Sequence, residues 1–102
     1  MAVEFTKENF AQTDEGLAII DFWATWCGPC RMQGPVIEQL ASEYEGEILI
    51  GKVDVDQQKE LAAQFGVMSI PTIVFKKDGQ VVDQVVGYHS KDQLEAIIAR
   101  LK

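Results

Sequence analysis

Two cysteines, three positions apart in the chain, are the residues with the clearest capacity for chemistry. They lie in the run Trp-Cys-Gly-Pro-Cys at residues 26–30, and the 102 residues include no third cysteine and one histidine, His89. Two thiols are too few for the disulfide framework of a small secreted protein, and a structural zinc site usually needs four Cys or His ligands. The spacing therefore favours a reversible dithiol–disulfide couple of Cys27 and Cys30, with a chance pair of buried thiols as the alternative.

The expected position of the pair supports this interpretation, because the pair follows a buried strand and opens a helix. Residues i and i+3 of one helical turn lie ~5–6 Å apart, and disulfides accept Cα separations of ~4.4–6.8 Å. The positive end of the helix favours a thiolate on Cys27 and lowers the pKa of that thiol. Cys30, one turn inside, is expected to be the more buried, resolving thiol. Gly28 permits close approach of another chain, and Pro29 sets the first helical turn.

Asp21 is a second candidate, because an acid within the apolar run 19–23 is costly to bury. It either faces water from a strand or is a buried carboxyl group whose pKa is raised by desolvation. In the second case it can act as general base and acid beside Cys30, directly or through a water. Lys52, within another apolar run, is interpreted as an ion-pair partner that moderates this shift, the alternative being a surface lysine at a sheet edge.

The elements that must position these residues alternate between strand and helix. The run 17–24 is almost continuously apolar, which is typical of a strand covered on both faces. An Asp-Gly turn at 78–79 predicts a hairpin, and Ser90 with Gln93 predicts a capping box. Asp56 is expected to cap the helix that follows it. Strands are predicted at 2–5, 17–24, 48–55, 72–76 and 81–86, and helices at 6–14, 27–44, 56–65 and 90–102.

This order predicts an α/β fold in one domain over residues 1–102. Strands joined through helices pair in parallel by right-handed crossovers, whereas the closing hairpin must be antiparallel. The simplest packing is one central mixed five-stranded sheet flanked by four helices on both faces.

Composition and charge narrow the class of protein. The apolar fraction of 47% is that of an ordinary globular chain, and sixteen acids against nine bases give a net charge of −7. An acidic chain without a basic cluster is not expected to bind nucleic acid or a membrane surface. No run is long and apolar enough to span a bilayer, and the first residues lack an export signal, so we expect a cytoplasmic protein.

The run 26–30, in this setting, closely resembles the active site of the thioredoxin family. The resemblance extends over essentially the whole chain. Together the matching segments are very specific for this family, whereas a Cys-x-x-Cys pair alone would be only moderately specific. The matching segments are Asp21-Phe-Trp-Ala24, Pro35, Lys52-Val-Asp-Val-Asp56, Ile70-Pro71-Thr72 and Gly87.

The resemblance implies a thioredoxin fold and a protein disulfide reductase that maintains cell redox homeostasis. It implies that Asp21 is the buried general acid/base. It also implies a cis-proline at Pro71, whereas the sequence alone would favour the common trans form. The exposed backbone of Ile70 would then hydrogen-bond an extended substrate. Substrate-binding residues implied in this way, or by their place beside the cysteines, are Trp26, Val55, Ile70 and Gly87.

The resemblance also implies the partners: disulfide-containing substrate proteins and a thioredoxin reductase that uses NADPH and FAD. The chain has no Gly-x-Gly-x-x-Gly run, so we expect it to bind no nucleotide or other cofactor itself. We expect a monomer whose only redox group is the Cys27–Cys30 disulfide, and no metal. One alternative function is a redox-switched protein-binding module that acts mainly through an apolar docking patch around the cysteines, made of Trp26, Gly28, Pro29, Val55, Ile70 and Gly87. Another is a metal site that two copies share through these cysteines.

Overall fold

Five strands of the chain form a single mixed sheet. The computed structural model describes residues 1–102. The strands are β1 (Val3–Glu4), β2 (Leu17–Trp23), β3 (Leu49–Asp54), β4 (Thr72–Lys77) and β5 (Gln80–Val86). The helices are α1 (Gly28–Glu43), α2 (Lys59–Gln64), α3 (Lys91–Leu101) and a 3₁₀ helix (Phe10–Asp14).

The strand order in the sheet is β1-β3-β2-β4-β5. β3 is parallel to both β1 and β2, while β4 is antiparallel to β2 and β5 is antiparallel to β4. In this register Asp21 of β2 lies opposite Lys52 of β3. The mixed five-stranded sheet predicted from the alternating elements is therefore confirmed.

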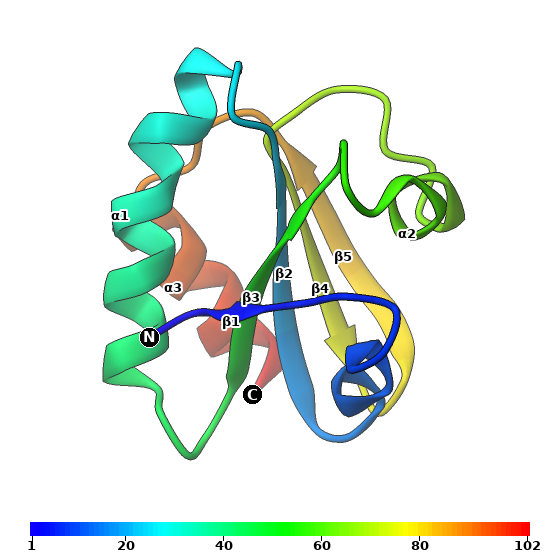
Figure 1. The fold of residues 1–102 in the computed structure, drawn as a ribbon. Helices are drawn as coiled ribbons and strands as arrows, with labels where there is room; N and C mark the ends of the chain where they lie inside the picture. The colour runs from blue at the N-terminus through cyan, green and yellow to red at the C-terminus, as the bar shows by residue number, and fades with distance from the viewer.

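Helices cover both faces of the sheet, with α1 and α3 on one face and α2 with the 3₁₀ helix on the other (Figure 1). Side chains alternate along a strand, so neighbouring residues of β2 enter different cores. Ile19 packs with Leu40 and Leu94 from α1 and α3, whereas Ile20 packs with Leu61 of α2. Asp21 is two positions after Ile19, so its side chain points to the same face of the sheet. This is the face that α1 covers, where the cysteines lie.

The first predicted helix, at 6–14, differs from the structure. Only Phe10–Asp14 is helical there, and it forms a 3₁₀ helix, so the chain has three α-helices and one 3₁₀ helix around its sheet. Side chains explain the late start: Asn9 Oδ1 accepts the Thr6 N–H at 2.8 Å, and Thr6 Oγ1 accepts the Glu8 N–H at 3.3 Å. Such local bonds offer the backbone an alternative to the α-helix.

The predicted cap at Asp56 is also wrong. α2 begins at Lys59, after Gln58, which caps it without a side-chain hydrogen bond. Asp54 Oδ1 instead accepts the N–H groups of Asp56 and Gln57, at 2.9 and 3.3 Å. This turn delays the helix, and it leaves the Asp56 carboxylate available for a contact with Trp26.

The predicted hairpin turn after β4 and the predicted capping box of α3 are both confirmed. The hairpin of β4 and β5 turns at Asp78 and Gly79, whose φ angles of 50° and 85° are those that a tight hairpin turn requires. Ser90 and Gln93 form both halves of a capping box at the start of α3.

Gly51 of β3 lies where no larger residue fits. A Cβ atom there would stand 2.5 Å from the Val3 carbonyl oxygen and 2.5 Å from a ring carbon of buried Phe5. We therefore expect Gly51→Ala to lower the free energy of unfolding by about 1–3 kcal/mol, the usual cost of overpacking. Equilibrium denaturation in urea measures this change.

Gly34 provides the matched control, because it lies within α1 and a Cβ atom there meets nothing within 4 Å. Gly34→Ala is expected to raise the free energy of unfolding by about 0.5–1 kcal/mol, through the better helix propensity of alanine. Equal effects of the two substitutions would contradict the packing argument.

Candidate active site

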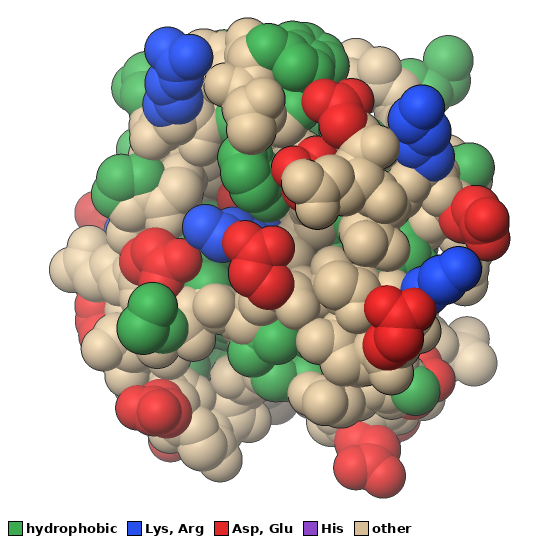
Figure 2. Space-filling model, in the orientation of Figure 1, with side chains coloured by type: hydrophobic (Ala, Val, Ile, Leu, Met, Phe, Trp, Pro, Cys, Tyr) green, Lys and Arg blue, Asp and Glu red, His purple; other side chains and the backbone are tan.

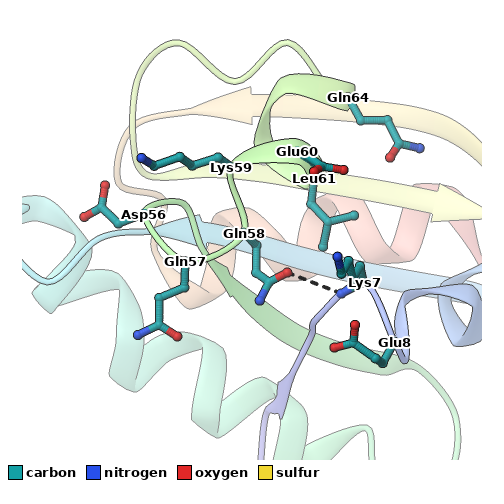
Figure 3. Close-up of a pocket in the computed structure, with 9 residues that line it drawn as sticks. All are labelled: Lys7, Glu8, Asp56, Gln57, Gln58, Lys59, Glu60, Leu61 and Gln64. Carbon is teal, nitrogen blue, oxygen red and sulfur yellow. Dashed lines mark hydrogen bonds between the residues drawn. The ribbon is translucent and has the colours of Figure 1, made fainter.

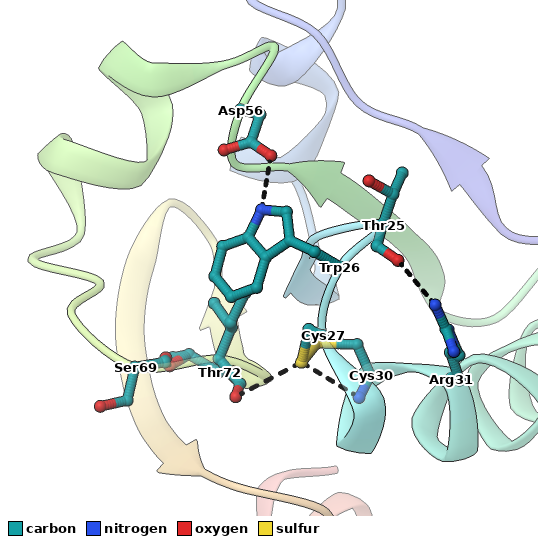
Figure 4. The surroundings of a disulfide bond; sticks show 9 residues. Thr25, Trp26, Cys27, Cys30, Arg31, Asp56, Ser69 and Thr72 are labelled. Atoms are coloured by element: carbon teal, nitrogen blue, oxygen red, sulfur yellow. Dashed lines mark hydrogen bonds between the residues drawn. A yellow bond between two sulfur atoms is a disulfide. The ribbon is translucent and has the colours of Figure 1, made fainter.

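Cys27 and Cys30 form a disulfide at the N-terminus of α1. Cys27 is the N-cap residue of the helix and Cys30 lies in its first turn, with a Cα–Cα distance of 5.3 Å. The Cys30 N–H donates to Cys27 Sγ over 3.2 Å, as Figure 4 shows. A free N–H group at the positive end of a helix stabilises negative charge. When the disulfide is reduced, the same geometry therefore favours a thiolate on Cys27.

Both cysteines are equally buried in this disulfide form, each being 5% exposed. The expectation that Cys30 is the more buried of the two is therefore wrong here. The covering residues come from distant loops: Val55 and Ile70 pack against the cluster of Ala24 and the two cysteines. Cys27 Sγ also lies 3.7 Å from the Ile70 carbonyl oxygen. Such contacts have no signal in the local sequence around the pair.

Asp21 is buried, with 1% of its surface exposed, so the interpretation that it faces water is wrong. Its Oδ1 atom has no hydrogen-bond partner. Burial raises the pKa of this carboxyl group to about 7, and the charge of Lys52 opposes the rise. A carboxyl group with such a pKa exchanges a proton easily near neutral pH.

Lys52 does not form a salt bridge with Asp21. Its Nζ atom lies 3.5 Å from Glu38 Oε2 of α1 and 5.4 Å from the centre of the Trp23 ring. Glu38 also accepts the Ala2 N–H at 2.9 Å. β3 lies between β1 and β2, so Lys52 is not at a sheet edge. Its effect on Asp21 is an attraction over a longer range, which lowers the pKa of the acid without a direct contact.

A cavity of about 150 Å³ joins Asp21 to the cysteine pair. Its lining residues come from β2, the segment after it, α1 and β3: Asp21, Trp23, Ala24, Thr25, Cys30, Arg31, Gly34 and Lys52. The side chains of Asp21, Thr25 and Lys52 offer polar partners there, so a space of this size has room for water. The cavity therefore provides a route by which a proton can pass between Cys30 and Asp21.

Two loops meet beside Cys27. The Ile70–Pro71 peptide bond is cis, as the resemblance implied. The Gly87 N–H donates to the Pro71 carbonyl oxygen at 2.8 Å, which ties the segment after β5 to the loop before β4. Gly87 has a φ angle of 90°, a conformation that favours glycine. The structure thus brings Ile70, Pro71 and Gly87 together around the disulfide.

Trp26 is the large apolar side chain nearest the pair in sequence, and it is 66% exposed. Its indole Nε1 donates to Asp56 Oδ2 at 2.8 Å (Figure 4). Gly28 and Pro29 are also exposed, whereas Val55, Ile70 and Gly87 are partly buried. In the space-filling view, a hydrophobic group lies at the top, the end at which α1 begins, with a basic side chain to one side of it and an acidic side chain to the other (Figure 2). An apolar surface of this kind suits contact with another protein.

The largest cavity, about 330 Å³, is lined by nine residues that do not include either cysteine (Figure 3). Polar and charged side chains from the segment after β1, from the turn before α2 and from α2 itself line it, with Leu61 as the one apolar member. Neither cysteine reaches this cavity, so it does not belong to the redox site.

Sequence reasoning missed three contacts at the site: those of Asp56 with Trp26, of Glu38 with Lys52, and of Gln33 with His89. Gln33 did leave a signal, because it interrupts the apolar stripe of α1 one turn after Cys30. The other two had none, since both acids also suit a solvated surface.

No group of three or more His, Cys, Asp or Glu side chains is arranged to hold a metal ion. No helix has the length and apolar character needed to cross a lipid bilayer.

Comparison with known proteins gives a consistent result. The family model described as Thioredoxin matches residues 1–100. The chain is 50% identical to the thioredoxin of Listeria monocytogenes over 99 residues, which cover 96% of each chain. It is 48% identical to the thioredoxin of Staphylococcus aureus over 97 residues, 94% of this chain and 93% of the relative. Among solved structures, the Malassezia sympodialis thioredoxin Mala s 13 is similar with a TM-score of 0.87 and 39% identity, over 98% of this chain and 90% of that one.

Proposed function

This chain belongs to the thioredoxin family, and from that premise we propose how its residues divide the work of disulfide exchange. It is a thiol–disulfide oxidoreductase, and its redox-active group is the Cys27–Cys30 disulfide. We infer the role of each residue from the arrangement of side chains at the N-terminus of α1. A cysteine pair caps α1, and a buried carboxyl group lies across a cavity from Cys30.

In the first step, the Cys27 thiolate attacks one sulfur of a substrate disulfide. A bond forms between Cys27 and that sulfur, the substrate S–S bond breaks, and the leaving substrate thiolate takes a proton from solvent. The role of Cys27 as nucleophile is supported by its place at the N-cap, where the Cys30 N–H donates to its sulfur. Exchange depends on the thiolate fraction of the attacking thiol.

In the second step, Cys30 loses its proton and attacks Cys27 Sγ. Asp21 accepts that proton, directly or through water in the cavity, and the second substrate thiolate leaves and is protonated. The substrate disulfide has gained two electrons, and the two cysteines have lost them. The roles of Cys30 as resolving thiol and Asp21 as general base are supported by the burial of Asp21 and by the shared cavity. Lys52 limits the rise in the pKa of Asp21.

Substrate proteins dock on the surface around the disulfide. Trp26, Gly28 and Pro29 supply its exposed part, while Val55, Ile70, Pro71 and Gly87 form the wall beside Cys27. Backbone groups of Ile70 can hydrogen-bond an extended segment of substrate, as in the addition of a strand to a sheet edge. The packing of Val55 and Ile70 against the cysteines supports this assignment.

Membership in the family implies a reductase and substrate proteins as partners. We propose in finer detail that an NADPH-dependent flavin enzyme, a thioredoxin reductase, re-reduces the disulfide. We also propose that residues 1–102 act as one domain, as a monomer in the cytoplasm, and that no metal or cofactor binds this chain.

A coupled assay tests this proposal. The wild-type protein is mixed with NADPH, a bacterial thioredoxin reductase and a protein disulfide, and the oxidation of NADPH is followed. We expect oxidation to depend on all three proteins and to yield two thiols for each NADPH consumed. Oxidation that does not require this chain, or that yields no substrate thiols, would contradict the proposal.

Asp56 provides a test of the docking surface, because it holds the indole of Trp26 in one orientation. We expect Asp56→Ala to raise KM for a protein disulfide roughly two- to tenfold, the effect of one hydrogen bond. The kcat value should stay near that of the wild type, since Asp56 does not touch the sulfurs. Steady-state kinetics with varied substrate measures both constants.

Glu60→Ala is the matched control, since Glu60 is an exposed acid that lines the same large cavity as Asp56 and forms no hydrogen bond with Trp26. Its KM is expected to equal that of the wild type. An equal rise in KM for both variants would mean that negative charge, rather than the orientation of Trp26, affects docking.

A further inference from the structure

Gln33 is a fully buried polar residue on the core-facing side of α1, one turn after Cys30. Both polar atoms of its amide bind the backbone of one distant residue. Nε2 donates to the His89 carbonyl oxygen at 3.0 Å, and Oε1 accepts the His89 N–H at 2.8 Å. A buried amide is costly unless it is satisfied in this way. Two bonds to the same residue fix its position as well as its distance.

His89 belongs to the segment 87–90, which joins β5 to α3 and passes close to the first turns of α1 (Figure 1). The other end of this segment is also tied. The Gly87 N–H donates to the Pro71 carbonyl oxygen at 2.8 Å, and His89 Nδ1 lies 2.8 Å from the Gly87 carbonyl oxygen. A continuous series of contacts therefore runs from α1 through His89 and Gly87 to the loop beside Cys27.

We propose that Gln33 is a positioning residue for protein substrates: it clamps the segment 87–89 to α1 and so holds Gly87 and Ile70 in the geometry that docks a substrate beside Cys27. This inference rests on the proposed function, because it takes those two residues as part of the docking surface. Gln33 itself touches neither substrate nor sulfur.

The proposal separates two kinds of substrate. A protein disulfide needs the loops, because its backbone must lie along them while Cys27 attacks. A small aromatic disulfide, such as 5,5′-dithiobis(2-nitrobenzoic acid), needs only access to the Cys27 sulfur. A residue that merely fills the core would affect stability, and through it both substrates alike. A variant that is impaired with the protein substrate but not with the small disulfide therefore indicates a positioning role.

The test compares Gln33→Met, which keeps the length of the side chain and removes both hydrogen bonds, with Gln39→Met. Gln39 is exposed on the same helix, so its substitution makes the same chemical change without removing the hydrogen bonds to His89. We expect Gln33→Met to raise KM for a protein disulfide about five- to a hundredfold, the combined effect of two hydrogen bonds. Its rate with the small disulfide should stay within about twofold of the wild-type rate. Gln39→Met should match the wild type with both substrates.

Amide hydrogen exchange supplies a second measurement that needs no variant. In the wild-type protein the His89 N–H is bonded to Gln33, whereas the neighbouring Tyr88 N–H has no hydrogen-bond partner. We expect the His89 amide to exchange far more slowly than that of Tyr88. Equally fast exchange of the two would mean that the clamp does not persist in solution, and would overturn the proposal.

The outcomes distinguish this inference from the function on which it rests. A KM near the wild-type value for Gln33→Met, or equal losses with the protein and the small disulfide, would overturn the positioning role alone. If the wild-type protein itself failed to reduce the protein disulfide, the proposed function would fail instead. That result is visible before any variant is compared.

Discussion

Cys27→Ser is expected to abolish turnover of a protein disulfide, with a fall of more than about a thousandfold. A serine hydroxyl forms no thiolate near neutral pH and cannot make the first sulfur–sulfur bond, so both steps of the exchange are lost. Serine is close to cysteine in size, and the variant should keep its fold. The measurement is the reduction of a protein disulfide with a small dithiol as electron source, with circular dichroism to check the fold.

Cys30→Ser is the matched comparison, since it leaves the nucleophile in place and removes the resolving thiol. We expect this variant to form the mixed disulfide with substrate and then stop, so that a covalent complex accumulates in mass spectrometry. Accumulation in Cys27→Ser instead would reverse the roles proposed for the two cysteines. Equal turnover by the wild type and both variants would exclude the pair as the redox centre.

Asp21→Asn is expected to have the second largest effect, with two separate consequences. The first is on the rate. General acid–base groups typically contribute 10²–10⁴-fold, but the cavity beside Asp21 lets water accept part of the proton flux. We therefore expect turnover to fall at least about tenfold near pH 7. Mixed disulfide should accumulate, because the step that slows is the deprotonation of Cys30.

The second consequence of Asp21→Asn is on stability, and its sign follows from the pKa. Burial raises the pKa of Asp21 from 3.8 to about 7, so the folded state holds this proton more tightly than the unfolded state does. Asp21 therefore lowers the stability of the wild type as pH rises from about 4 to about 7. The full shift corresponds to about 4 kcal/mol, at about 1.4 kcal/mol for each pKa unit.

Denaturation of the oxidised wild type and of Asp21→Asn at several pH values measures this difference. Above pH 7 the variant should be the more stable protein, by up to about 4 kcal/mol, and near pH 4 the two should be similar. All other titrating groups are common to both proteins and cancel in the comparison. A difference that does not change with pH would show that Asp21 keeps an ordinary pKa.

Local patterns were sufficient to predict most elements of the fold. The apolar run of β2, the Asp-Gly turn after β4 and the capping box of α3 each depend on neighbours in sequence, and all three appear in the structure. The exceptions were also local in origin. Thr6, Asn9 and Asp54 bond to nearby backbone N–H groups and delay the two helices on one face of the sheet.

The sequence by itself determined that a cysteine pair opens a helix after a buried strand, and that an acid lies within that strand. Only the tertiary structure decided which groups meet around them: Lys52 with Glu38, Trp26 with Asp56, and Gln33 with His89. It also decided that Cys27 is as buried as Cys30, because distant loops cover both. The physical reason is that these contacts join residues 14 to 56 positions apart, through strand register and helix packing. Periodicity and capping signals extend over only a few neighbouring residues and carry no information at that range.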